Sequence, residues 1–166
     1  MFRCIEYTAF LWKAKGRHGT HSPFAYWLAD HVNRQKAQHS KNEFTEISSR
    51  KTRNFLNRLS NCLPHFQIFN FTQKESPIPK GLGEKEPSIL ILWAKQIAEI
   101  EVCVPFELLH PDTILVILEP HRSSHKEVWQ GIVAYPTFHF SADCFDFGLL
   151  SPRPGQAKEH FYLKLS

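Results

Sequence analysis

The sequence contains no long uninterrupted apolar segment. The apolar run closest to the N-terminus, Tyr7–Trp12, spans six residues and is interrupted by Thr8. A membrane-spanning helix needs about 20 apolar residues, and a signal peptide needs a longer apolar centre than this run offers. We therefore expect no targeting segment, no membrane contact and a cytoplasmic protein.

Cysteine is scarce and widely spaced. The four cysteines, Cys4, Cys62, Cys103 and Cys144, form no Cys-x-x-Cys pair. Such pairs are the usual mark of zinc ligands and of redox-active thiols. The spacing therefore predicts reduced, mostly buried thiols and no metal site built from them.

Neither sign of charge dominates the whole chain, which has 20 Lys and Arg, 16 Asp and Glu, and a net charge of +4. Residues 1–60 hold eleven Lys and Arg against four Asp and Glu, a net charge of +7, and residues 61–166 hold nine against twelve, a net charge of −3. RNA-binding modules usually interleave basic residues with exposed aromatic residues, and no such motif occurs here. We expect solvated helix faces and no nucleic-acid partner, with salt-dependent nucleic-acid binding as the alternative.

The sequence does contain an alternation of buried strands and helices in its second half. Ser88–Trp93 and Thr113–Leu118 are apolar runs of six residues, typical of strands buried on both faces of a parallel sheet. Lys95–His110 between them is long enough for the helical crossover that parallel strands require, and Pro105 should divide it. The other elements expected here are a strand at His65–Phe71, a helix at Ser123–Tyr135, and strands at Thr137–Ala142, Phe145–Leu150 and His160–Leu165.

Three helices are expected before the first strand. Periodic apolar residues predict a helix over Phe2–Lys15. Ser22 followed by Pro23 predicts the N-cap and first residue of a second helix. A third helix is expected at Ile47–Leu63, with Arg58 among the residues that face outward.

Two unusual strings carry a resemblance to a known family. They are "HGTHSPF" before the second helix and "AKEHFYLKL" at the C-terminus. With their flanking segments, they make the chain resemble class I S-adenosylmethionine-dependent methyltransferases, in the O-methyltransferase-like group common in Bacteroidetes. The resemblance implies a truncated Rossmann-like α/β fold, with a sheet of about five mostly parallel strands, helices on both faces and added N-terminal helices.

The resemblance also implies a glycine-rich cofactor turn, which this chain lacks. In such folds the cofactor lies at the carboxyl ends of the first strands, and the turn after strand one needs glycine because its backbone approaches the ligand closely. Residues 72–77, after the candidate strand His65–Phe71, read TQKESP without glycine. Gly81 and Gly83 come about ten residues too late, and we expect them to belong to an ordinary loop.

The chain is also too short for the complete family fold. Sixteen residues, Thr72–Pro87, separate strand one from the next strand, whereas a βαβ unit needs about 30. The sheet would keep family strands one, four, five, seven and six, and the ribose-binding acidic residue would have no place. We expect one compact domain, with a helical region at residues 1–64, an incomplete Rossmann-like region at residues 65–166, and a loop at 73–87.

Losing two strands would leave strand one at the edge of the sheet. Because an uncovered apolar edge promotes association, we expect this edge to be covered. The N-terminal helices, the 73–87 loop, a second copy of the chain in a homodimer or another protein partner would serve.

The carboxylates that the family tends to carry after strands four and five are also mostly missing. The corresponding segments read Trp93-Ala94-Lys95 and Glu119-Pro120-His121. If the protein is active, the resemblance makes Glu119 and His121 the candidate catalytic residues. The candidate cofactor-binding residues would then be His18, His21 and Thr72.

His121 and His125 are four residues apart and could share a helix face as metal ligands. Ser123 or Ser124, however, is the expected N-cap of this helix, which leaves His121 outside it. We therefore expect no metal site.

These departures predict a methyltransferase-like protein that is degenerate and non-catalytic, holds no cofactor, and acts as a binding or assembly module. The alternative is an active S-adenosylmethionine-dependent O-methyltransferase that acts on a small molecule through an atypical cofactor site.

Overall fold

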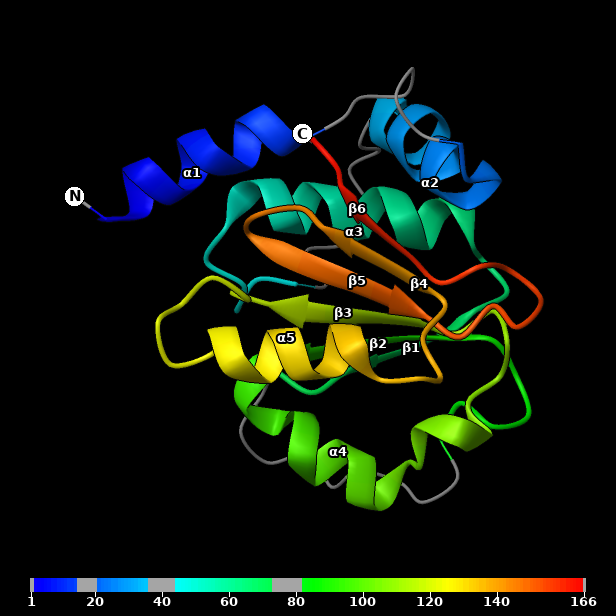
Figure 1. Cartoon of the computed structure of the whole chain (residues 1–166). Coiled ribbons are helices and arrows are strands. Elements are labelled where there is room, and N and C mark those ends of the chain that lie inside the picture. Colours follow the sequence, from blue (N-terminus) through cyan, green and yellow to red (C-terminus); the bar gives the residue numbers. More distant parts are fainter. Residues whose placement is uncertain (1, 15–20, 36–43, 73–81, 166) are drawn as a thin grey trace.

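A six-stranded mixed sheet lies between two layers of helices in the computed structural model, which describes residues 2–14, 21–35, 44–72 and 82–165, with side chains from Ile5 onward (Figure 1). The strands are β1 (Gln67–Asn70), β2 (Ser88–Trp93), β3 (Ile114–Leu118), β4 (Phe140–Asp143), β5 (Phe147–Ser151) and β6 (Glu159–Tyr162). Their order is β1-β2-β3-β5-β4-β6. β1, β2 and β3 are parallel, β5 is antiparallel to both of its neighbours, and β4 and β6 are parallel.

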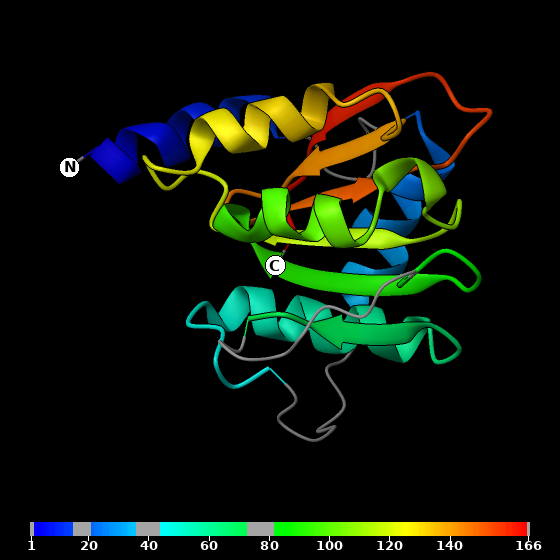
Figure 2. The same cartoon turned by 90° about the horizontal axis from the view of Figure 1, so that it is seen from below.

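The sheet is thus mostly parallel, as expected, but it has six strands rather than five. The sixth is β6, which overlaps the segment His160–Leu165 that was itself expected to be a strand, and it pairs with β4 and forms the second edge. Figure 2 shows the strands side by side, with α1 (Phe2–Lys13) and α5 (Lys126–Ala134) near the β4–β6 side of the sheet.

Alternating side chains of β2 enter two separate hydrophobic cores. Ile89 and Ile91 pack on the face covered by α2 (Pro23–Trp27), the π-helical turn η2 (Leu28–Val32) and α3 (Arg50–Cys62). Leu90 and Leu92 pack on the face covered by α4 (Ile97–Cys103) and α5. Because helices cover both faces, the strand is apolar without alternation. The 3-10 turns η3 (Ala94–Gln96) and η4 (Phe106–Leu108) flank α4.

Local capping signals set the start of the second and third helices. Ser22 is the N-cap of α2, its hydroxyl oxygen accepts a hydrogen bond from the Ala25 amide at 3.4 Å, and Pro23 is the first helical residue. Ser49 caps α3 in the same way, through the Thr52 amide at 3.3 Å. α3 therefore begins three residues later than the expected Ile47.

The expectation that Arg58 faces solvent is wrong. Its side chain is buried, and its guanidinium donates a hydrogen bond to the carbonyl oxygen of Asn33 at 2.7 Å. The bond ties α3 to the residue that follows η2, so tertiary packing decides the position of this arginine.

β1 is the edge strand of the described sheet. It pairs directly with β2, with Gln67 opposite Ser88 and Asn70 opposite Ile91. No described residue forms a strand beyond it, as the short connection to β2 predicts. The loop expected to cover this edge lies mostly outside the described residues. Among the described helices, none has the length and apolar content to cross a membrane.

Candidate functional site

The loop after β3 begins with a tight turn at Glu119. This residue has a positive φ of 53°, and its amide donates to the carbonyl oxygen of Asp146 at 3.1 Å. Its own carbonyl oxygen lies 3.1 Å from Nδ1 of His125. This turn places the N-cap of α5 at His125, so the expected cap at Ser123 or Ser124 is wrong.

The same loop positions His121 against Asp143, the last residue of β4. His121 Nε2 lies 2.7 Å from Oδ2 and 3.0 Å from Oδ1 of the carboxylate. Asp143 is 2% exposed, and Oδ1 also accepts a hydrogen bond from the Phe145 amide at 2.8 Å. The imidazole stacks on the Phe145 ring, with centroids 5.1 Å apart. A buried carboxylate that holds a partly exposed histidine is an arrangement suited to acid–base chemistry or to ligand binding.

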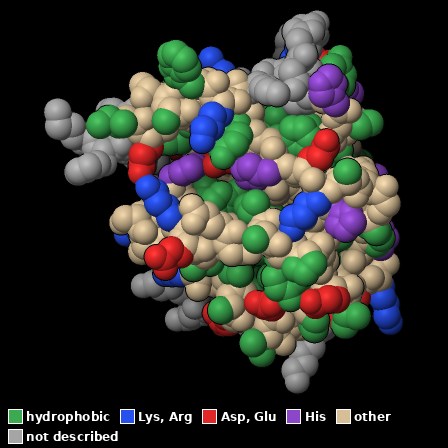
Figure 3. Space-filling model, viewed as in Figure 1, with side chains coloured by type: hydrophobic (Ala, Val, Ile, Leu, Met, Phe, Trp, Pro, Cys, Tyr) green, Lys and Arg blue, Asp and Glu red, His purple; other side chains and the backbone are tan. Residues whose placement is uncertain are grey.

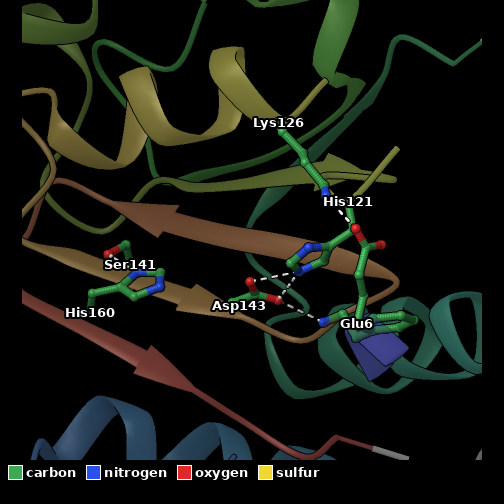
Figure 4. A network of polar contacts seen from close by, with 7 residues as sticks. Glu6, His121, Lys126, Ser141, Asp143 and His160 are labelled. Carbon is green, nitrogen blue, oxygen red and sulfur yellow. Dashed lines mark hydrogen bonds and ion pairs between the residues drawn. The ribbon is translucent and has the colours of Figure 1, made fainter. Parts of the chain in front are cut away.

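Strands β4 and β6 place further polar side chains on the same face of the sheet. Ser141 and Asp143 are two residues apart in β4, as are His160 and Tyr162 in β6, so all four share a face. The register sets Ser141 opposite His160 and Asp143 opposite Tyr162. Figure 4 shows Asp143 between His160 on one side and His121 on the other.

Ser141 and His160 form a second polar pair. Ser141 Oγ lies 2.8 Å from His160 Nδ1 and 3.3 Å from the carbonyl oxygen of Glu159. Burial lowers the pKa of His160, an effect opposed by the charge of Asp143. Ser141 is 1% exposed, so its hydroxyl orients the histidine and is not placed to attack a substrate.

A cavity of about 600 Å³ lies between α1, α5 and the β4–β6 pair. It is lined by His121, Asp143 and His160 together with the aromatic residues Phe10, Trp129 and Tyr162, the lysines Lys13, Lys126 and Lys158, and Glu6. Lys126 donates to the Glu6 carboxylate, which links α5 to α1 (Figure 4). On the face seen in Figure 3, histidine side chains lie beside a hollow with hydrophobic side chains in it.

Of the predicted catalytic residues, Glu119 and His121 lie together. Both line a smaller cavity of about 410 Å³ that also includes Arg122 and Lys126. Arg122 Nη1 lies 3.4 Å from Glu119 Oε2. This cavity and the larger one share Glu6, His121 and Lys126, so they adjoin each other.

Of the predicted cofactor residues, the two that the structure describes, His21 and Thr72, do not join this cluster. Thr72 follows β1 and contacts its own neighbours: its Oγ1 lies 2.7 Å from Asn70 Oδ1 and 3.1 Å from Glu46 Oε1. Asn70 also donates to Glu46. The Trp93 indole donates to the Thr72 carbonyl oxygen at 3.4 Å. The described polar groups at the end of β1 therefore bond to one another.

His21 lies near the amino end of β3. His21 directly precedes the N-cap of α2, and the nearby Pro23 lines a pocket with Asp112 at the amino end of β3. Glu119 lies at the other, carboxyl end of β3. His18 lies outside the described residues. Gly83 is also at the amino end of β3, where its carbonyl oxygen accepts the His110 amide at 2.7 Å.

Within the described chain, no group of three His, Cys, Asp or Glu residues is arranged to hold a metal ion. The imidazole of His121 contacts the Asp143 carboxylate. His125 is buried, and its ring lies within hydrogen-bonding distance of the backbone carbonyl oxygen of Glu119. Cys62, Cys103 and Cys144 are free thiols.

Asp143 and His160 are site residues that were not predicted from the sequence. The available signal was the alternation of polar residues, Ser-x-Asp at 141–143 and His-x-Tyr at 160–162, in segments expected to be strands. The contributions of Glu6 and Lys13 had no such signal, because they depend on where α1 packs.

Comparison with known proteins adds no relative: no protein-family model, curated protein or solved structure matches the chain. A function must therefore be inferred from these side chains and cavities.

Proposed function

We propose that this chain is a methyltransferase-like protein that has lost catalysis and its cofactor site and acts as a binding or assembly module. The sheet order supports the first part. The antiparallel β5 lies between β3 and β4, so β1-β2-β3-β5-β4 follows the order implied for family strands one, four, five, seven and six.

The observation that carries the proposal is that the polar groups at the carboxyl end of β1 bond to one another. A cofactor in a doubly wound fold lies outside the carboxyl ends of the strands, against a glycine turn. Support comes from the polar groups next to that position, which bond to one another: Asn70 and Thr72 bond Glu46, and the Trp93 indole donates to the Thr72 carbonyl oxygen. β1 is also the edge strand, so no neighbouring described strand supplies an acidic residue for the ribose.

Calorimetric titration with S-adenosylmethionine and S-adenosylhomocysteine tests this proposal. We expect no saturable heat at millimolar ligand from a sample that unfolds cooperatively, which shows that the protein was folded. Micromolar binding of either compound would overturn the proposal, because it would require a cofactor site that the β1 end does not offer.

One observation favours the alternative of an active O-methyltransferase. The His121–Asp143 pair lies beside Glu119 at the carboxyl end of β3, where a base could take the proton of a substrate hydroxyl as its oxygen accepts the methyl group of S-adenosylmethionine. Methyl transfer to a small hydroxyl compound, abolished in His121→Gln, would establish this alternative. Absence of transfer together with absence of cofactor binding would leave the binding role.

A further inference from the structure

The cavity between α1, α5 and the β4–β6 pair has the size and walls of a small-molecule site. Its volume of about 600 Å³ falls within the usual range for ligand pockets. Phe10 from α1, Trp129 from α5 and Tyr162 from β6 line it. The Phe10 and Tyr162 rings are 6.3 Å apart, and Trp129 lies 6.4 Å from the His160 ring. Aromatic walls on three elements favour a flat ring as the occupant.

The charges of the lining favour an anion. Three lysines and two acidic residues line the cavity, a balance of +1 with the histidines neutral. Both acids already have a basic partner, because Lys126 bonds Glu6 and His121 bonds Asp143. Because Lys126 offsets Glu6, Lys13 and Lys158 together outweigh Asp143 and leave a net charge of +1 to act on an occupant.

The two remaining lysines differ in how far they are committed. Lys158 Nζ donates to the carbonyl oxygens of Ala134 and Tyr135 at 2.8 and 2.6 Å, which fixes it at the end of α5. Lys13 Nζ lies over the Tyr162 ring, 5.3 Å from its centroid. Lys13 is thus the cation best placed to meet an acidic group on a ring that stacks against Tyr162.

We propose that this cavity binds a small aromatic carboxylate, with the ring among Phe10, Trp129 and Tyr162 and the carboxylate at Lys13. The inference rests on the proposed function in one respect, that the chain binds a ligand without transferring a methyl group to it. It names the chemical class of that ligand.

A nuclear magnetic resonance titration of the full chain tests the proposal with three probes: benzoate, its neutral isostere benzamide, and the non-aromatic acid cyclohexanecarboxylate. Benzoate is expected to shift the indole signal of Trp129 in a saturable way. Each of the other two should bind at least about ten-fold more weakly, the factor that corresponds to 1.4 kcal/mol.

Lys13→Gln should weaken benzoate binding about five-fold, as expected for a partly solvated ion pair. Lys95→Gln is the matched control, since Lys95 is exposed and does not line the cavity. Equal binding of benzamide and benzoate, no shift of Trp129, or equal effects of the two lysine variants would overturn the proposal.

The same samples titrated with S-adenosylhomocysteine separate the two claims. Silence of both ligands would defeat the aromatic-acid proposal and leave the loss of the cofactor site standing. Binding of S-adenosylhomocysteine would defeat the proposed function, whatever benzoate does.

Discussion

His121 Nε2 meets Asp143 Oδ2 at 2.7 Å, although one residue follows β3 and the other ends β4. β5 lies between these two strands in the sheet. The pair therefore spans the end of the sheet at which residues 144–146 turn from β4 into β5. Phe145 of that turn donates its amide to Asp143 and stacks on the imidazole. The pair therefore holds the turn and one end of the cavity together.

This linkage predicts a coupled loss of stability. His121→Ala leaves the buried Asp143 charge without its main partner and should lower the free energy of unfolding by about 2 kcal/mol, less than for a fully buried pair because His121 is partly exposed. The double variant with Asp143→Asn should cost less than the sum of the two single changes by at least about 0.5 kcal/mol. Urea unfolding of the four proteins measures this coupling, and strict additivity would show that the pair contributes nothing.

A pair of glycine substitutions tests the packing of α5 on the sheet. A Cβ at Gly148 in β5 would lie 2.2 Å from the Trp129 ring, so Gly148→Ala should destabilise the protein by about 1–3 kcal/mol. A Cβ at Gly131, inside α5, would meet nothing within 4 Å, and Gly131→Ala should stabilise by up to about 1 kcal/mol. Chemical denaturation of both variants checks the opposite signs. Equal changes in the free energy of unfolding would mean that Trp129 does not pack closely against Gly148 of β5.

His160 predicts a pH dependence of stability. Burial lowers its pKa in the folded state below the ordinary value of 6.5, so between these two values the unfolded chain binds the extra proton. Stability should therefore be fully present above about pH 6.5 and should fall as the pH drops through that value towards the folded pKa. Denaturation midpoints of wild type and His160→Gln at pH 7.5 and 5.5 measure the effect.

The control for this comparison is His65→Gln, because His65 is exposed. The wild type and the His65 variant should lose more stability on acidification than the His160 variant. An unchanged pH dependence in His160→Gln would contradict the burial of a neutral imidazole at this position.

The edge position of β1 gives a test of assembly. The amides of Gln67 and Phe71 donate to the carbonyl oxygens of Pro87 and Ile91, so the alternate amides of Ile68 and Asn70 face away from β2. If a second copy covers this edge, these two amides should exchange slowly with solvent at high protein concentration and faster on dilution. Fast exchange at every concentration, from a monomer by light scattering, would mean that no partner copy pairs with β1.

The parts of the fold that local chemistry decides could be predicted from the sequence. The apolar run of β2 was predicted with both of its ends, and Ser22 with Pro23 predicted the start of α2. Pro105 divides the crossover, since α4 ends at Cys103 and η4 begins at Phe106. Each of these signals acts within a few residues.

The candidate site was less predictable because its members meet through the order of the strands. The expected bases Glu119 and His121 do lie together, but Asp143 meets His121 from a strand that is two places away from β3 in the sheet. The burial of Arg58 likewise depends on the carbonyl group of Asn33, 25 residues earlier in the sequence. No local pattern encodes either contact.

The proposed loss of the cofactor site at the carboxyl end of β1 can be tested through Trp93. The indole N–H signal of Trp93 reports on this end of the strand because the indole donates to the carbonyl oxygen of Thr72. The measurement is a titration of the labelled protein with S-adenosylhomocysteine, followed by this signal in a two-dimensional nitrogen–proton spectrum. We expect the Trp93 signal to stay in place up to millimolar ligand. A saturable shift of the Trp93 signal at micromolar concentration would contradict it.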